Sequence, residues 1–247
     1  MTTTCLWRSF LSKLGIISLL LLLTTAHANI PLPGRYIAQS KGLSGGVGLG
    51  SQGHSRCKTL FTWTGYGNYS YSSLLAAGAS IKFAGGSLDS ANSLIYQRYS
   101  INAMFNKIRP EYAMFLGPSF SFEHTDLRAL ISELTKIGSS ERDDEERAET
   151  ECREIYSDIG SSLGYRSGLG YLLTPDWGIA LGHNLDLTFN GNYLISFGGS
   201  ISFNLRNRFD KLIENTQNVW LSLEYSNTST KKHLALHNII LGLALGF

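Results

Sequence analysis

The sequence predicts an all-β fold: an antiparallel up-and-down barrel of ten strands that crosses a membrane. Three observations predict it: an N-terminal export signal, two-residue alternation of bulky apolar side chains along most of the chain, and no later apolar run long enough for a membrane helix. Lipid offers no hydrogen bonds, so every backbone group inside a bilayer must be paired within the protein. Without a membrane helix, only a closed sheet can then cross the bilayer after export. The mean hydropathy of −0.03 agrees, because barrel strands face lipid only at every second residue.

The first 28 residues have the features of a signal peptide. Arg8 and Lys13 occur without any acidic residue, and an apolar run over residues 14–23 is followed by Ala-His-Ala at 26–28. The run is too short to span a bilayer as a helix, and the triplet matches a cleavage site. We expect cleavage after position 28, with an uncleaved anchor as the alternative, so that residues 29–247 form one barrel domain.

The charge of the mature part is balanced. The signal region holds two bases and no acid, so 21 − 2 = 19 Lys and Arg residues stand against 19 Asp and Glu residues. This balance gives no reason to expect nucleic acid or an anionic surface as partner. We also expect no cofactor and no metal.

The last strand has the clearest pattern, with bulky residues on one face and nearly bare positions on the other. Its bulky face consists of Ile239, Leu241, Leu243, Leu245 and Phe247. With the export signal, this strand resembles the bacterial outer-membrane β-barrel class, whose last strand commonly ends in an aromatic residue. The resemblance implies a Gram-negative outer membrane, contact with lipid and lipopolysaccharide, and Phe247 as a signal for the barrel assembly machinery. The chain is also loosely similar to solitary autotransporter-like barrels, which use more strands.

Seven stretches before the last strand repeat the alternation, which gives eight strands. They cover residues 69–83, 99–105, 112–122, 159–171, 179–189, 195–205 and 219–225. A further hairpin over 43–50 and 58–65, with a turn near Gly67 and Asn68, raises the count to ten. Eight strands are the alternative, since glycine weakens the first of these strands. A soluble sandwich or lipocalin-like barrel that buries the same faces is a further alternative.

The chain direction predicts that both termini lie in the periplasm and that the long segment 123–156 forms an extracellular loop. Apolar residues at helical spacing predict short helices beginning at residues 125–137, and the charged run 141–147 indicates a solvated face. A recognition surface, or a divalent cation site that bridges lipopolysaccharide phosphates, is the alternative for this run. Residues 207–218 form an unusually long link for the periplasmic side.

Cys57 and Cys152 remain after cleavage and fall on the same side of the membrane. Two cysteines in an exported chain are a candidate disulfide, which would pin the long loop to the rim of the barrel. Two unpaired thiols are the alternative.

Charged side chains at inward positions are balanced in sign. The expected lumen charges are Lys82, Arg98, Arg166 and Arg206 against Glu111, Asp158, Asp186 and Glu224. Charges away from water need partners, so these residues predict a salt-bridged filling of a narrow lumen. The alternative is a narrow, weakly selective pore whose constriction uses the same side chains.

The histidines match no catalytic signature, so we predict no enzyme and keep a hydrolase or lipid-modifying enzyme as the weakest alternative. The candidates for such an activity are His54, His124 with Asp126, His233 and His237. His183 is unusual, because its parity directs a polar ring to lipid in mid-strand, and we expect a bulge or a shifted register there. The sequence thus predicts a structural or surface-interaction protein with an unknown extracellular ligand.

Overall fold

The structure is a computed structural model. It describes residues 30–34, 36–54, 57–87, 92–129, 160–205, 218–230 and 236–247. Several sequence-based predictions lie outside the described residues. These are the signal peptide and its cleavage site, the side chains of Cys57 and Cys152, most of the loop 123–156, Asp158, Arg206, His233 and all but the last residue of the link 207–218.

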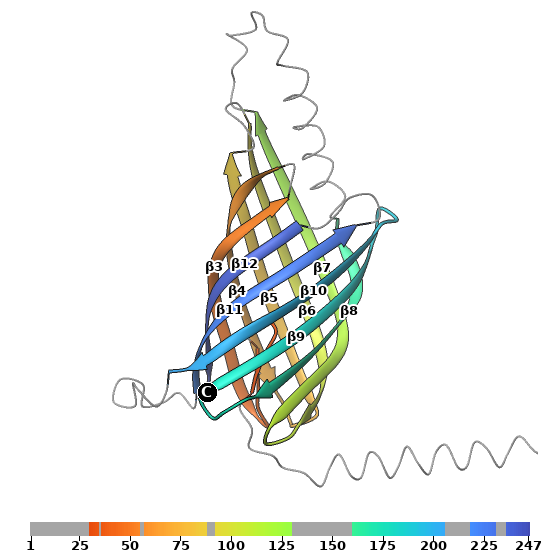
Figure 1. Cartoon of the computed structure of the whole chain (residues 1–247). Coiled ribbons are helices and arrows are strands. Elements are labelled where there is room, and N and C mark those ends of the chain that lie inside the picture. Colours follow the sequence, from red (N-terminus) through yellow and green to blue (C-terminus); the bar gives the residue numbers. More distant parts are fainter. Residues whose placement is uncertain are drawn as a thin grey trace, which may run out of the picture.

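Ten antiparallel strands form a closed barrel, and a separate two-stranded sheet precedes them (Figure 1). The short strands are β1 (Ile30–Leu32) and β2 (Tyr36–Ala38). The barrel strands are β3 (Gly42–His54), β4 (Cys57–Ser70), β5 (Leu75–Ser87), β6 (Asn92–Ile108), β7 (Tyr112–Ala129), β8 (Ser162–Leu172), β9 (Trp177–Thr188), β10 (Tyr193–Asn204), β11 (Asn218–Thr230) and β12 (Leu236–Gly246). Neighbours in the barrel follow the chain, and β12 pairs with β3 to close it. The ten-strand prediction is confirmed.

Two predicted boundaries are wrong. Gly67 and Asn68 do not form a turn but lie inside β4, paired with Gly45 and Ser44 of β3. The turn comes later, where the Ser72 hydroxyl accepts hydrogen bonds from the amides of Leu74 and Leu75, both at 3.2 Å. Strand β7 also continues through Ala129, so residues 125–129 are extended rather than the start of a helix. In the described part of the chain, no helix is long and apolar enough to cross a bilayer.

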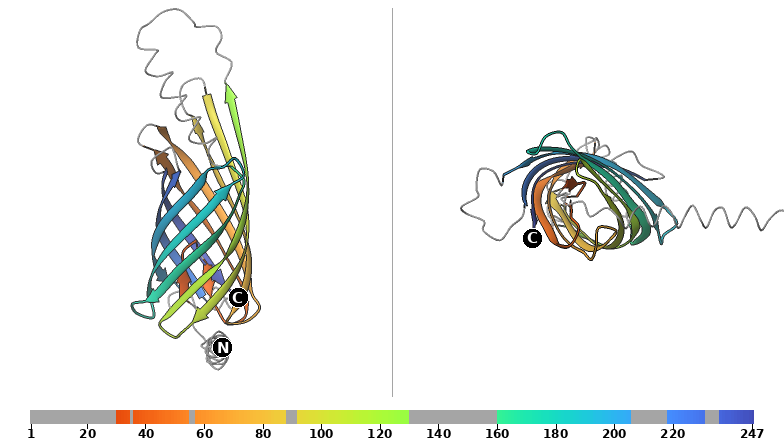
Figure 2. Two further views of the ribbon diagram at one scale, coloured as in Figure 1. Left: turned by 90° about the vertical axis from the view of Figure 1, so that its right-hand side faces the viewer. Right: turned by 90° about the horizontal axis from the view of Figure 1, so that it is seen from below.

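The two ends of the barrel differ in the length of their connections. Short turns at residues 71–74, 109–111 and 173–176 lie at the same end as Phe247, which is the pattern of periplasmic turns in outer-membrane barrels (Figure 1). We therefore call this the periplasmic end and the opposite one the outer end. At the outer end β6 and β7 are the longest strands, with 17 and 18 residues, and they project as a paired ribbon (Figures 1 and 2).

The outside of the barrel is a belt of large apolar side chains. Leu181, Phe197, Leu223 and Leu241 are each exposed by more than half, although they lie in the middle of regular strands. Their inward neighbours are small or polar, as the buried Ser200 and Ser222 show. A surface of this kind is unfavourable in water and favourable in hydrocarbon, so the barrel is built to lie in a bilayer.

A cation in the middle of this belt tests the orientation of the side chains. We expect Leu241→Arg to lower the free energy of unfolding by about 2 to 4 kcal/mol, because a guanidinium at the bilayer centre is poorly solvated. The measurement is reversible urea unfolding in lipid vesicles, followed by tryptophan fluorescence.

The matched control is Ser229→Arg, because Ser229 lies four residues beyond Tyr225 at the outer end of β11. The expected cost there is about 0 to 1 kcal/mol. Equal costs at the two positions would mean that the assigned membrane belt is misplaced.

Candidate functional site in the filled lumen

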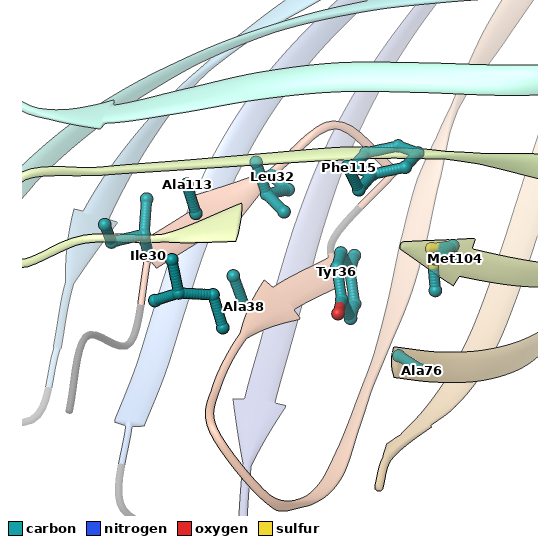
Figure 3. Close-up of a cluster of buried hydrophobic side chains, with 9 residues drawn as sticks. Ile30, Leu32, Tyr36, Ala38, Ala76, Met104, Ala113 and Phe115 are labelled. Atoms are coloured by element: carbon teal, nitrogen blue, oxygen red, sulfur yellow. The ribbon is translucent and has the colours of Figure 1, made fainter. Parts of the chain in front are cut away.

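The N-terminal hairpin of β1 and β2 lies inside the barrel at the periplasmic end of the lumen (Figure 2). Ile30, Leu32 and Ile37 are at most 1% exposed inside the barrel. Around them lies a cluster of buried side chains from the wall, shown in Figure 3. The wall residues of this cluster are Ala76, Met104, Ile108, Ala113 and Phe115. The hairpin is therefore an apolar plug.

Specific contacts fix the position of the plug. The Asn106 side-chain amide donates a hydrogen bond of 2.7 Å to the Tyr36 hydroxyl. The Tyr36 ring meets the Phe115 ring edge to face, with centroids 5.9 Å apart and planes at 86° (Figure 3). On the other side of the hairpin, Ile37 packs against the buried Trp220 of β11. These contacts come from opposite walls, so the plug bridges the lumen.

Glycines on β8 and β9 make room for the hairpin. A Cβ atom on Gly170 would overlap the carbonyl oxygen of Pro31, and one on Gly178 would lie 2.7 Å from the Pro31 ring. A Cβ atom on Gly182 would lie 2.8 Å from Pro33. Glycine normally weakens a strand, but here its missing side chain allows a second backbone to approach. The wall is thus shaped to receive the hairpin.

Nearer the outer end, charged residues from three strands meet around Arg98 of β6. The Arg98 guanidinium donates a hydrogen bond of 2.7 Å to Asp186 of β9. Its Nε atom lies 3.4 Å from Glu123 of β7, and the Tyr96 hydroxyl donates to the same carboxylate at 2.6 Å. The carboxylate side chains are only 2% and 3% exposed, so their charges depend on these partners.

Above the hairpin lies a cavity of about 270 Å³ whose lining mixes polar and apolar side chains, with Arg98 among them. The Lys82 ammonium group reaches across it and donates a hydrogen bond of 2.7 Å to Asn238. Arg166 and Glu224 also face this space, and the hairpin residues Pro33 and Gly34 form its floor. The cavity can hold water or a small polar solute, but the plug blocks its way to the periplasmic end.

Comparison with solved structures returns barrels of bacterial outer membranes. The outer-membrane protein Ail of Yersinia pestis in a lipid nanodisc is 11% identical, with a TM-score of 0.36, over 84% of this chain and 100% of Ail. Neisserial surface protein A is 9% identical, with a TM-score of 0.33, over 83% of this chain and 96% of that chain. The KdgM porin, in complex with oligogalacturonate, is 10% identical, with a TM-score of 0.30, over 83% of this chain and 99% of KdgM.

No protein-family model and no curated protein sequence matches this chain. Its own architecture decides the class: a closed antiparallel barrel with an apolar outer belt and a polar, filled interior. The chain has the fold of an outer-membrane β-barrel. This fold implies a location in an outer membrane, and the filled lumen becomes the feature that its function must explain.

The structure places five of the eight expected lumen charges inside the barrel. These are Lys82, Arg98, Arg166, Asp186 and Glu224. Glu111 differs from the expectation, because it lies exposed in the short turn between β6 and β7. Glu123 was assigned to the outer loop from the sequence, yet it lies in the lumen since β7 is longer than expected. The apolar alternation ends at Phe122, so the sequence offers no local signal for the extension of β7.

The hairpin was missed altogether. Its strands have only three residues each, too few to display a two-residue period. The one local signal was Pro33-Gly34, a dipeptide typical of turns, in which Gly34 adopts a φ of 77°. The glycines of β8 and β9 carried the complementary signal.

The three candidate catalytic histidines that the structure describes do not all lie in one place. His54 and His237 lie at the outer ends of β3 and β12, whereas His124 lies on the projecting part of β7. The Nδ1 atom of His237 lies 2.7 Å from the Tyr225 hydroxyl in a hydrogen bond. Among the described residues, no group of three or more His, Cys, Asp and Glu side chains is arranged to hold a metal ion.

Removing the central cation tests the ion cluster. We expect Arg98→Met to lower the free energy of unfolding by about 3 to 5 kcal/mol, because Glu123 and Asp186 would be left as buried, unpaired charges. Urea unfolding in lipid vesicles provides the measurement.

The triple variant Arg98→Met with Glu123→Gln and Asp186→Asn is the control, and it should recover most of this loss. If the single variant is as stable as the wild type, the cluster does not hold charged partners in place.

Adding side chains to the glycine wall tests the seat of the hairpin. Gly170→Val should displace the hairpin while the barrel still forms, because the new Cβ overlaps Pro31 and not the neighbouring strands. Trypsin treatment of vesicles from the periplasmic side should then cleave the segment around Arg35. Gly67→Ala is the matched control, since a Cβ there meets no atom within 4 Å. Equal protection of both variants would contradict the proposed seat.

Proposed function

We propose that this protein is a non-conducting outer-membrane barrel that acts as a structural or surface-interaction protein at its outer end. The observation that carries the proposal is the filling of the lumen at the periplasmic end by the hairpin of β1 and β2. Nearer the outer end, the Arg98 cluster adds charged side chains along the wall formed by β6 to β9. A path for solutes would have to displace the hairpin. The filled interior instead suits a rigid scaffold that presents other parts of the chain.

The outer end supports this role. Strands β6 and β7 are paired from Arg98 and Glu123 out to Asn92 and Ala129, beyond the last β7 residue that pairs with β8, Ser121. A strand needs only about 9 to 11 residues to cross the membrane, so this ribbon stands in the external medium. His124 on the ribbon is exposed. We propose that the ribbon and the segment that follows it contact an extracellular ligand or lipopolysaccharide.

A narrow pore is the second candidate. The cavity of about 270 Å³ favours it, because the charged side chains in its lining, such as Lys82, Arg166 and Glu224, would suit a small hydrated solute if the hairpin moved away. In this function the hairpin would act as a gate rather than as a permanent filling. The two candidates therefore differ in whether the hairpin leaves its seat in the intact protein.

Conductance across planar lipid bilayers distinguishes the two candidates. We expect the wild-type barrel to give no discrete conductance steps at high protein load, because the hairpin fills the periplasmic end of the lumen. A variant that lacks residues 30–38 should give small, reproducible steps when Arg98 is also replaced by Ala. Reproducible steps from the wild type would contradict the non-conducting role and favour the gated pore.

A further inference from the structure

A titratable residue breaks the apolar pattern of the membrane-facing surface at mid-depth. His183 lies in the middle of β9, and its neighbours across the strands are Phe197 of β10 and Ser167 of β8. The pairing is regular on both sides, so neither a bulge nor a shifted register turns the ring inward. The expected bulge is therefore absent, and the imidazole belongs to the lipid-facing side.

The depth of this side chain is near the bilayer centre. His183 lies 183 − 177 = 6 residues from Trp177 and 189 − 183 = 6 residues from Phe189, which are aromatic residues at the two ends of the apolar belt. Six residues of a tilted strand rise by about 14 Å, roughly half of the apolar band. Hydrocarbon at this depth offers no hydrogen-bonding group, and a polar ring there is costly.

The surroundings cover the ring without satisfying its nitrogens. The Tyr165 and Phe197 rings lie on either side, with centroids 5.6 Å and 4.6 Å from that of His183. Within the described residues, the His183 ring and the Tyr165 hydroxyl form no hydrogen bond, and the Ser167 hydroxyl lies 3.5 Å from the His183 carbonyl oxygen. The patch thus holds a phenolic donor and an imidazole acceptor that do not pair with each other.

Elsewhere on the barrel, a tyrosine and a histidine do form a hydrogen bond with each other. Near the outer end, the Tyr225 hydroxyl and the His237 Nδ1 atom form a hydrogen bond of 2.7 Å, and their rings stack with centroids 6.1 Å apart. That pair needs no further partner and lies close to water. Tyr165 and His183 have similarly close rings but no such bond, at a depth where neither lipid nor water supplies one.

We propose that this patch, made of Tyr165, Ser167, His183 and Phe197, is the interface between two copies of the chain in the membrane. At the bilayer centre only another protein can offer hydrogen bonds. The patch carries both a donor and an acceptor, which is what a two-fold interface requires, because each copy must complement itself. The Tyr165 hydroxyl of one copy donates to the His183 imidazole of the other, and the symmetric bond forms a second time.

The apolar rim supports such a contact. Leu169 and Leu181 flank the patch and are 43% and 66% exposed, while Phe197 is 60% exposed. Packing of these side chains against a second copy excludes lipid from the polar centre. Membrane interfaces combine close packing with a few polar contacts in this way.

The test measures self-association of the full mature chain in lipid vesicles. Copies labelled with donor or acceptor dyes are diluted over a range of protein-to-lipid ratios, and energy transfer gives the dimer fraction. We expect the wild type to form dimers and His183→Leu or Tyr165→Phe to weaken association about tenfold, since each removes both symmetric hydrogen bonds. The double variant should be no weaker than either single variant, because the two residues are partners.

Tyr225→Phe is the matched control, since it breaks the internal pair near the outer end, and its association should equal that of the wild type. Heat-modifiable gel migration and urea unfolding check that each variant is folded. His183→Leu should fold, because it only adds apolar surface to the lipid face. A monomeric wild type at every ratio would overturn the proposal. So would unchanged association of both single variants, or a patch that binds a different membrane protein while copies of this chain stay apart.

Discussion

Closing a sheet in lipid satisfies every backbone hydrogen bond but creates an interior that has to be filled, and most features of this barrel answer that constraint. Ten strands enclose more space than the inward side chains of this chain fill, since many of them are glycine, alanine or serine. The N-terminal hairpin supplies apolar volume at the periplasmic end, where Ile30, Leu32 and Ile37 are almost completely buried. Full burial of one such side chain contributes about 1.5 to 3 kcal/mol, so the hairpin stabilises the barrel as a core would.

The hairpin and the Arg98 cluster are held in the lumen by different interactions. The hairpin is held by apolar contacts and shape, which vary little with salt, whereas the Arg98 cluster is held by charge pairs with little access to water. The cluster joins β6, β7 and β9, and therefore fixes the strands that rise toward the outer ribbon. A rigid base for that ribbon is a mechanical reason to keep costly buried charges in a barrel that the hairpin already blocks.

The sequence predicted the parts of the fold that lipid imposes and missed those that depend on contacts inside the lumen. Outward positions alternate because hydrocarbon selects apolar side chains at every second residue, so the strands and their number followed from periodicity. Gly67-Asn68 looks like a turn but lies within β4, because pairing with β3 outweighs the local preference. Gly170 and Gly178 weaken strands when taken alone, and only the approach of Pro31 explains them. Such pairings join residues more than 130 positions apart and leave no local pattern.

The strictness of the outward rule is also what makes an exception informative. A lumen position tolerates either a charge or a methyl group as long as its neighbours match, so a single inward polar residue says little. A lipid-facing position at mid-depth is surrounded by hydrocarbon alone, so a polar residue there implies that something other than hydrocarbon contacts it. His183 is such a residue. It lies in a regular strand, between two aromatic rings, with its nitrogens unpaired in the described part of the chain. Tyr225 and His237 show that a tyrosine and a histidine of this barrel can hydrogen-bond within one copy. Tyr165 and His183, at the centre of the belt, do not, which favours a partner that carries the same two groups.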